Sequence, residues 1–276
     1  MSVVLKARGL PAPMEPTDGG GSNVDDINFC VLGPVEARTG GQRVPVNGGR
    51  QLTVLAVLAL SAGRVVTTER LTRAVWDGVP PPTAHAQIHG TVFRLRRCLR
   101  GLIHTCGQGY LLAAASEQVD AMVFRSCAGE ARAAARDSRP AEAAALFRSA
   151  LGLWRGDALD GVTGLGAEAA ELEEERNTAI EGLFAAELAA GRHAQVIPDL
   201  YGYVMKLPWR EPLRGLLMLA LYRCGREAEA LTAYRDGCGL LAELGMQPGA
   251  GLGRLAEAIR IRDPRLSAPF PMTLAR

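Results

Sequence analysis

The sequence predicts a mostly α-helical protein in two parts: a winged helix-turn-helix of mixed α+β structure, followed by an all-α domain that resembles tetratricopeptide repeats. Three observations predict this fold. Short apolar strands, three helical segments and a C-terminal hairpin occur in that order over residues 27–113. Two later segments match in register 34 residues apart, which is the tetratricopeptide period. Positive charge is concentrated in the first part alone.

The chain of 276 residues is long enough for two domains. Residues 1–26 combine several prolines with a run of glycines and are expected to form a disordered tail. We place the winged domain at 27–113, the helical domain at 118–262 and a second tail at 263–276. No run of about 18 uncharged apolar residues is present. No apolar core follows Lys6 and Arg8, so no signal peptide is expected. These features predict a cytoplasmic, nucleoid-associated protein with no membrane contact.

The net charge of +2 hides a strong asymmetry between the two parts. Residues 27–113 hold ten arginines and three acidic side chains, which is a balance of +7. Residues 114–264 hold 17 basic and 22 acidic side chains, which is a balance of −5. Such a separation indicates that the first part meets a polyanion such as nucleic acid.

Strands are predicted at both ends of the winged domain. The apolar run 27–38 and the short run 43–46 flank Gly40–Gly41 and are expected to form two strands joined by a glycine turn. The segment 102–114 is expected to form a hairpin that turns at residues 107–109. The hairpin would be the wing of the domain.

Three helices are predicted between these strands. Leucine and alanine recur at helical spacing over residues 50–62, which indicates a first core helix. Thr68 is placed to cap a second helix over residues 69–76. A run of three prolines then stops any helix, and Thr83 is placed to cap a third one that ends near residue 100.

The third helix is expected to carry one apolar stripe and one exposed face. Ile88, Val92, Leu95 and Leu99 recur at positions i, i+4, i+7 and i+11, so they face the core. The other side suits a major groove, where small residues let the backbone approach, Arg reads guanine, Gln reads adenine and apolar groups contact the thymine methyl. The residues predicted to contact DNA from this helix are Gln87, His89, Thr91, Phe93, Arg94, Arg97 and Arg100, with Ala86 and Gly90 as the small residues among them.

Further contacts are predicted around this helix. Arg100 and one of Arg96 or Arg97 lie near the helix end and are expected to bind phosphates, which position a protein without specifying sequence. Gln108, at the tip of the hairpin, is expected against the minor groove. The indole N–H of Trp76 can donate to a phosphate, although a core position is the more frequent role. The segment RLRR alone fits a solvated helix face equally well, but an aromatic residue on the exposed side and the charge balance favour DNA.

From residue 119 onward nearly every segment is predicted to be helical. GRHAQVIPDL, starting at Gly191, and GREAEALTAY, starting at Gly225, share a glycine turn, an alanine at the fourth place and a large residue at the tenth. A longer step from Ala141 to Ala194 breaks the period, and the segment RGDALDGV after Trp154 supplies the extra length. The predicted helices are 119–137, 141–154, 168–190, 193–206, 212–223, 227–244 and 249–261.

Nothing in the sequence indicates catalysis. The six cysteines form no CxxC pair and have no histidine at zinc-finger spacing, so reduced thiols used as small apolar side chains are expected. No GxSxG, HExxH or strand-linked GxGxxG motif occurs. No catalytic residue, metal or cofactor is therefore predicted. The carboxylates of residues 171 and 173–175 have two open interpretations, a solvated helix face or an acidic surface for a polymerase subunit.

Two sets of segments resemble a known family. FCVLGPVEAR, GGRQLTVLAVLALSAGRVVTTERLTRAVWDG, VFRLRRCLR and GQGYLL resemble the DNA-binding half of the Streptomyces antibiotic regulatory protein family, which is itself similar to OmpR-type winged helices. ALFRSALGLWRGDAL, GRHAQVIPDL, LMLALYRCGREAEALTAYR and LLAELGMQPGAGLGRLAEAI resemble that family's bacterial transcriptional activation domain. The resemblance spans about residues 27–262. It implies an activator of an antibiotic or secondary-metabolite gene cluster that binds direct repeats near the −35 element of promoter DNA as a homodimer and recruits RNA polymerase.

One stretch departs from the family pattern. Before RLRR the family usually carries a bulky residue and a small hydroxyl residue, whereas this chain has Gly90 and Phe93, so the base preference of the family is not carried over. Longer members add an ATPase domain, and no GxxxxGK[ST] motif for such a domain is present. The alternative function is a helical scaffold whose winged domain binds protein rather than DNA. Binding to a promoter duplex distinguishes the two.

Overall fold

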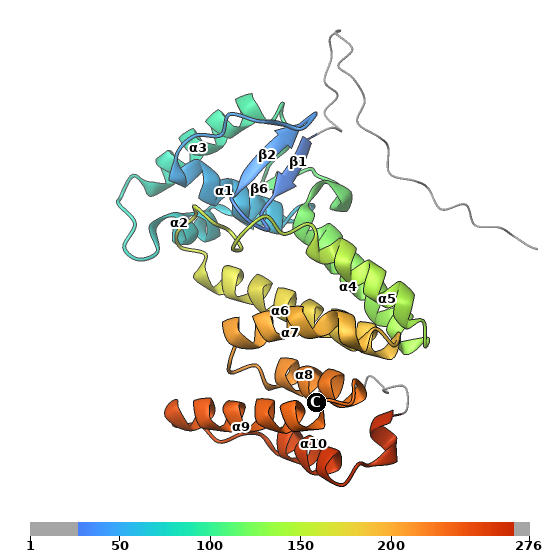
Figure 1. Cartoon of the computed structure of the whole chain (residues 1–276). Helices are drawn as coiled ribbons and strands as arrows, with labels where there is room; N and C mark the ends of the chain where they lie inside the picture. Colours follow the sequence, from blue (N-terminus) through green and yellow to red (C-terminus); the bar gives the residue numbers. More distant parts are fainter. Residues whose placement is uncertain (1–26, 268–276) are drawn as a thin grey trace, which may run out of the picture.

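The computed structural model describes residues 27–267, so the tail predicted for residues 1–26 lies outside the described residues. Two small sheets and three helices occupy one end of the molecule, and the later helices extend away from them toward the other end (Figure 1). The mostly helical fold with a small β region at the start is therefore confirmed. The second tail, predicted from residue 263, begins with a short 3-10 helix instead, η3 (Pro264–Ser267), and Leu266 of this helix packs into a core.

The first sheet is antiparallel and differs from the predicted pair of strands. It contains, in spatial order, β1 (Ile27–Cys30), β2 (Glu36–Thr39) and β3 (Gln42–Arg43). The apolar run 27–38 is broken in two, because residues 31–35 leave the sheet to bind another part of the chain. The turn at Gly40–Gly41 joins β2 to β3 as expected, but β3 is only two residues long.

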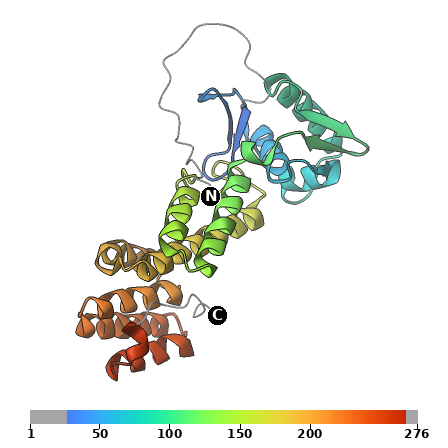
Figure 2. The same ribbon diagram turned by 90° about the vertical axis from the view of Figure 1, so that its right-hand side faces the viewer.

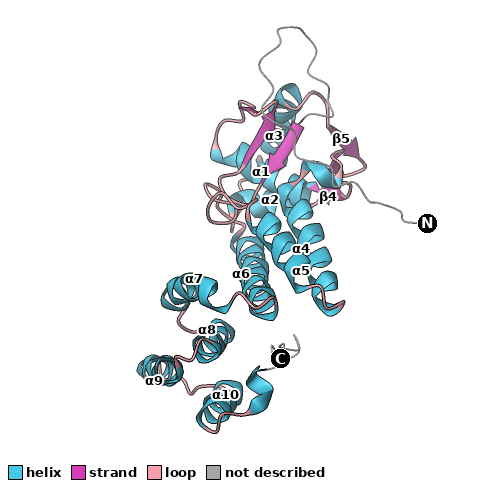
Figure 3. Ribbon diagram, turned by 45° about the vertical axis from the view of Figure 1, so that its right-hand side comes forward, coloured by secondary structure: helices cyan, strands magenta, loops and turns pink. Residues whose placement is uncertain are grey.

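The second sheet forms the wing and includes a strand that the sequence did not indicate. Its strands are, in spatial order, β4 (Val65–Thr67), β6 (Gly109–Leu112) and β5 (Ile103–Cys106). β4 pairs antiparallel with β6, although more than 40 residues separate the two strands in the sequence. Gly109 makes this pairing possible, because a Cβ atom there would lie 2.3 Å from the carbonyl oxygen of Val66. The sheet lies beside the third helix of the domain (Figure 3).

The three helices of the winged domain form where the sequence predicts them. They are α1 (Gly49–Leu60), α2 (Thr68–Trp76) and α3 (Ala84–Cys98). The cap of α2 is Thr67 rather than Thr68, since the Thr67 hydroxyl accepts from the backbone N–H of Arg70 at 3.2 Å. Thr83 precedes α3 but its side chain caps no backbone group of that helix.

The second part consists of seven helices between residues 120 and 260, each within a few residues of its predicted bounds. They are α4 (Asp120–Arg136), α5 (Pro140–Leu151), α6 (Gly166–Ala189), α7 (His193–Lys206), α8 (Glu211–Arg223), α9 (Glu227–Glu243) and α10 (Ala250–Arg260), with a 3-10 turn, η2 (Ser116–Gln118), before them. Gly191 and Gly225 adopt φ angles of 80° and 76°, so the repeated sequence corresponds to a repeated left-handed turn. The helices α7 to α10 stack in layers at the far end from the sheets (Figure 2). Within residues 27–267, no helix has both the length and the apolarity needed to cross a membrane.

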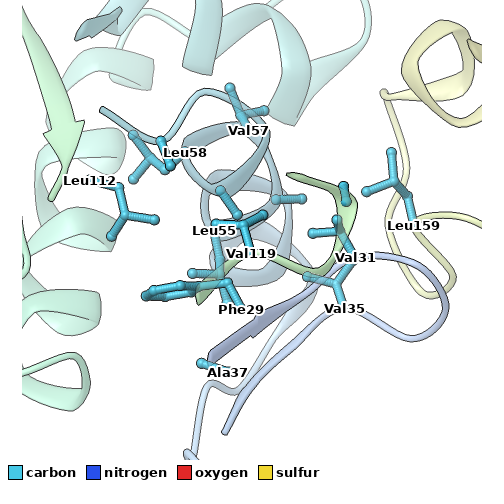
Figure 4. Close-up of a cluster of buried hydrophobic side chains, with 14 of the residues drawn as sticks. Phe29, Val31, Val35, Ala37, Leu55, Val57, Leu58, Leu112, Val119 and Leu159 are labelled. Atoms are coloured by element: carbon cyan, nitrogen blue, oxygen red, sulfur yellow. The ribbon is translucent and has the colours of Figure 1, made fainter. Parts of the chain in front are cut away.

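Buried apolar side chains form two large clusters that do not follow the predicted domain boundary. The first core runs from Ile27 to Ala179 and combines the winged domain with α4, α5 and the first half of α6. Figure 4 shows its centre, where side chains of β1, α1 and β6 meet those of the later chain around Leu159. The second core runs from Ile180 to Leu266 and contains only helical segments of the second part.

A polar joint continues the first core across the boundary. The turn between β1 and β2 pairs with the loop after α5: the backbone N–H groups of Arg155 and Leu159 donate to the carbonyls of Leu32 and Val31 at 2.8 and 3.0 Å. The Asp120 carboxylate accepts from the backbone N–H of Val31 at 2.9 Å. We call residues 31–36, 120 and 155–160 the interdomain joint. The extra length after α5 that breaks the repeat period is therefore the segment that binds the winged domain.

The side chain of Arg155 binds buried acids in this joint. Its guanidinium donates to the Glu36 carboxylate at 2.7 Å and lies 3.6 Å from that of Asp120. Burial raises the pKa of Asp120, while the backbone donors of residues 31 and 32 and the charge of Arg155 act to lower it. The joint is thus held by directed hydrogen bonds as well as by apolar contact.

Candidate nucleic-acid interface

Helix α3 is held with one face outward because its apolar stripe is fully buried. Ile88, Val92, Leu95 and Leu99 are each at most 1% exposed, as the spacing predicts. Burial of each such side chain is worth roughly 1.5–3 kcal/mol, so rotation of the helix about its axis would be costly. The opposite face is consequently fixed in solvent.

The outward face of α3 carries most of the predicted DNA-contacting residues. Phe93 is 63% exposed, and the side chains of Arg94 and Arg97 are also exposed. Exposure of a large aromatic side chain to water is unfavourable, and a partner that covers the ring removes this cost. The exposed Phe93 beside two arginines is the combination that a groove with phosphate walls and apolar thymine methyls can accommodate.

Thr91 lies almost entirely beneath this face. It is 2% exposed, and its hydroxyl donates to the carbonyl of Gln87 at 2.8 Å. Thr91 lies at the border of the apolar stripe, one helical turn from Ile88 and Leu95, and its side chain is buried with them. We therefore correct the prediction that Thr91 contacts DNA. The Thr91 hydroxyl instead accepts a hydrogen bond from the Arg94 guanidinium at 3.4 Å and so supports that side chain.

Arg50, which the sequence reasoning missed, joins α1 to the exposed face. Its guanidinium donates to the side-chain carbonyl of Gln87 at 2.6 Å, and the Gln87 amide donates to the hydroxyl of Thr83 at 2.9 Å. The same guanidinium lies 5.2 Å from the centre of the Trp76 ring, a distance that permits cation–π attraction. Trp76 is half-buried and packs against the first core, and its contact with DNA stays a prediction.

A hollow of about 290 Å³ lies at the surface between α1 and α3. Residues of α1 and α3 line it: Arg50, Ala86, Gln87, Gly90, Thr91 and Arg94. Two of the lining residues, at positions 86 and 90, are small, as expected where a helix backbone must approach another molecule. The only signal for Arg50 in the sequence was its place directly after Gly48–Gly49, at the start of a helix.

The wing is attached to both neighbouring helices. The carbonyl of Gln108 accepts from the backbone N–H and the hydroxyl of Thr68 at 3.1 and 2.9 Å, while the Gln108 residue itself is exposed at the hairpin tip. Arg96 donates to the carbonyl of Ile103 at 2.9 Å and to the hydroxyl of Thr105 at 2.6 Å. Of the two arginines considered for phosphate binding, Arg96 thus binds the wing.

The remaining predicted residues lie at the two edges of α3. Arg97 is exposed within the helix, and Arg100 is exposed just beyond its end with a φ angle of 51°. His89 is exposed on the wing side, where its Nδ1 atom is hydrogen-bonded to the hydroxyl of Tyr110. Apart from Thr91, the predicted residues of α3 and its C-terminal end are at least partly exposed, and Gln108 is exposed at the tip of the wing.

Part of the positive balance is neutralised within the protein. At least four of the ten arginines in the winged domain form ion pairs: Arg38 and Arg43 with Glu36, Arg70 with Glu168, and Arg73 with Glu69. The two around Glu36 lie by the interdomain joint rather than on α3. Fewer arginines are consequently offered to a polyanion than the count of charges suggests.

The acidic run of α6 has a structural role. Glu175 binds Arg125 at 2.8 Å, and Glu174 binds Arg210 at 2.6 Å. The hydrogen bonds from Arg210 lower the pKa of Glu174, despite some desolvation. The Glu173 carboxylate accepts from the backbone N–H of Ala158 in the interdomain joint. Glu171 and Glu174 are exposed, as a solvated helix face requires, and the carboxylates of residues 173–175 also connect α6 to other helices and to the joint.

No metal centre emerges from the described chain. Between residues 27 and 267 no group of three or more His, Cys, Asp or Glu side chains lies close enough to hold a metal ion. All six cysteines are present as half-buried free thiols. Burial raises the pKa of Cys30 and Cys127, which favours the unreactive thiol form.

Comparisons with known proteins cover both parts of the molecule. A family model described as "Bacterial transcriptional activator domain" matches residues 119–260. The regulatory protein DnrI of Streptomyces peucetius is 34% identical over 261 residues, which cover 89% of this chain and 96% of DnrI. The regulatory protein AfsR of Streptomyces griseus is 36% identical over 253 residues, which cover 90% of this chain but only 26% of AfsR. The chain thus spans about a quarter of AfsR.

A solved structure matches the whole arrangement. It is the structure titled "Mycobacterium tuberculosis EmbR in complex with low affinity phosphopeptide", with a TM-score of 0.83 and 32% sequence identity. The match covers 87% of this chain and 66% of the EmbR chain. A match of that extent includes both the winged and the helical part.

Proposed function

We propose a function from one premise: the chain belongs to the Streptomyces antibiotic regulatory protein family. The protein is a transcriptional activator that acts in the cytoplasm on a gene cluster for an antibiotic or another secondary metabolite. Its winged domain binds direct repeats near the −35 element of the promoter, and its helical domain contacts RNA polymerase. Two protomers bind side by side on the repeats.

The exposed face of α3 is the observation that carries this proposal. A buried stripe fixes the helix, an aromatic and two arginines project from it, and the wing stands beside it. A helix and a hairpin in this relation suit the major groove and the adjacent minor groove of one duplex. A single reading helix covers few base pairs, so useful affinity calls for two protomers on adjacent half-sites.

Apolar side chains on the helical domain support a protein contact there. Tyr201, Met205 and Trp209 lie four residues apart along α7 and the turn after it, and each is exposed. The spacing places Tyr201 and Met205 on one side of the helix, and Trp209 follows in the turn after it. Exposed aromatic and methionine side chains at such spacing are frequent in protein interfaces, and this patch is the candidate polymerase contact.

The first experiment measures duplex binding to the promoter of a neighbouring biosynthetic operon by fluorescence anisotropy. If three to five arginines meet phosphate, log K falls against log salt with a slope of about −3 to −5 per protomer. Arg94→Ala should weaken binding to the cognate site by about 1–3 kcal/mol and to random DNA by less. Arg235→Ala, an exposed arginine on α9, is the matched control and should leave both affinities unchanged.

The outcomes separate the alternatives. Equal losses on cognate and random DNA would make Arg94 a phosphate contact. Absence of salt-sensitive binding to any duplex would contradict the proposal and favour a protein-binding scaffold.

The second experiment separates activation from binding in a reconstituted transcription assay. Met205→Asp should leave DNA affinity intact and reduce transcription, because the substitution alters the exposed patch of α7 and not α3. Thr232→Asp, at an exposed position of α9, is the control for an added negative charge. Full transcription by Met205→Asp would place the polymerase contact elsewhere.

A further inference from the structure

One hydrogen bond joins the reading face of α3 to the wing. The hydroxyl of Tyr110, on β6, lies 2.5 Å from Nδ1 of His89, on α3. The two rings meet edge to face, with centres 6.0 Å apart and an angle of 74° between their planes. Tyr110 is 2% exposed, whereas His89 is exposed on the side of α3 that faces outward.

The burial of Tyr110 determines the direction of this bond. Desolvation raises the pKa of the Tyr110 hydroxyl, outweighing the opposing charge of Arg96, so the group keeps its proton at neutral pH. A buried hydroxyl must donate its proton to some acceptor. His89 Nδ1 is the acceptor that lies within reach in the described structure. The bond therefore runs from the Tyr110 hydroxyl to Nδ1.

The direction of the bond fixes the tautomer of His89. A neutral imidazole carries one proton, and when Nδ1 accepts a hydrogen bond that proton resides on Nε2. Nε2 lies on the far edge of the ring from Nδ1, so it points away from Tyr110. Because His89 is exposed, this edge meets whatever molecule covers α3.

The surroundings hold Tyr110 in place for this role. The guanidinium of Arg96 lies 5.8 Å from the centre of the Tyr110 ring and is itself bound to the wing through Thr105. β6 is fixed between β4 and β5, with Tyr110 opposite Val66 and Thr105. The hydroxyl is consequently presented to His89 by a rigid sheet.

We propose that Tyr110 is a positioning residue that fixes His89 as an Nε2–H donor, and that this donor makes the protein select guanine over cytosine at one base pair of its site. The inference rests on the proposed DNA-binding function. In the major groove guanine offers the acceptors O6 and N7, whereas cytosine presents its N4 amino donor there. A fixed Nε2–H donor can form a hydrogen bond with the guanine acceptors, whereas the amino group of cytosine repels it. Without Tyr110 the ring can present either a donor or an acceptor, and the preference weakens.

The tautomer is tested in the free, full-length protein by ¹⁵N NMR of the imidazole rings at pH 8. We expect the wild-type His89 signal to report the Nε2–H form and Tyr110→Phe to convert it to a mixture of tautomers. His89→Ala assigns the signal by its loss, and Tyr201→Phe, an exposed tyrosine on α7, is the control. An Nδ1–H form in the wild type, or an unchanged signal in Tyr110→Phe, would overturn the assignment.

The base preference is tested by selection from a random duplex library. At one base pair we expect the wild type to select guanine, and both Tyr110→Phe and His89→Ala to lose about tenfold of the guanine-over-cytosine preference there. The preferences at the other positions should stay as in the wild type. His89→Ala, at an exposed position, keeps the test open if Tyr110→Phe fails to fold.

The possible failures are distinguishable. Unchanged selectivity in both variants, or cytosine at the affected pair, overturns the role of His89 alone. No enriched sequence for the wild type overturns that role together with the proposed function, and the NMR measurement still reports the tautomer.

Discussion

The two cores of this protein are built in different ways. The first core joins strands, helices and a loop that lie more than 100 residues apart in the sequence, whereas the second stacks helices that follow one another along the chain. In the second, each helix contacts its neighbours in sequence, so the repeat pattern alone describes the packing. In the first, the helical domain completes the core of the winged domain. The reading helix is therefore supported by residues outside the predicted DNA-binding part.

This difference separates a boundary in composition from a boundary in the packing of buried side chains. A boundary at residues 114–117 follows the change in composition and charge, yet Phe29 and Val119 form an isolated parallel bridge across it. The first core gives way to the second inside α6, between Ala179 and Ile180. The border between the two cores thus lies within α6 rather than at residues 114–117.

The largest expected effect comes from truncation. A fragment of residues 27–113 should fail to fold cooperatively, because it exposes the apolar surface that α4, α5 and Leu159 cover. A fragment of residues 27–190 should retain a cooperative thermal transition, since it keeps the first core complete. Circular dichroism on heating measures both. A sharp transition in the shorter fragment would show that the winged domain is independent of the joint.

A matched pair of cavity substitutions compares the cores directly. Phe124→Ala in the first core and Phe184→Ala in the second each remove a buried ring and should each cost about 3–5 kcal/mol of unfolding free energy. Only Phe124→Ala should weaken duplex binding at temperatures where both variants remain folded, because only the first core supports α3. Denaturant unfolding and anisotropy provide the two readouts. Equal losses of DNA affinity would contradict the separation of the cores.

Substitution of the joint should have a moderate effect. Arg155→Ala removes charged hydrogen bonds to Glu36 and should lower the unfolding free energy by roughly 1–3 kcal/mol. The loss stays moderate because Arg38 and Arg43 continue to neutralise Glu36. Arg235→Ala on α9 is the control and should show no measurable change in urea unfolding. An unchanged unfolding free energy in Arg155→Ala would mean that apolar contacts alone hold the joint.

The smallest expected effect is a pH dependence confined to the second core. Burial, followed by the charge of Arg223, lowers the pKa of His193 below the usual 6.5. Below pH 6.5 the unfolded chain therefore binds more protons than the folded one, so stability falls as pH decreases toward the folded pKa. His193→Asn should flatten the change in thermal midpoint between pH 7.5 and pH 5.5. The exposed His85→Asn should leave that change as it is in the wild type.

The candidate interface was predictable to the extent that helical spacing determines it. The stripe of α3 follows from periodicity alone, and so does the outward position of Phe93, Arg94 and Arg97. Spacing places Thr91 near the edge of that face, and a shift of a fraction of a turn makes it core instead. Arg50 and Tyr110 reach the interface from α1 and β6, and no local pattern connects them to α3.

By itself the sequence determined the elements that depend on neighbours along the chain. The helices, the wing hairpin and the 34-residue repeat follow from apolar period, turn glycines and prolines, which act over a few residues. Tertiary structure alone decided which distant segments meet: β4 with β6, the loop after α5 with the turn after β1, and the Tyr110 hydroxyl with His89. Such pairings depend on the shape of a completed core and on hydrogen-bond partners far away in sequence. A pattern of spacing contains neither.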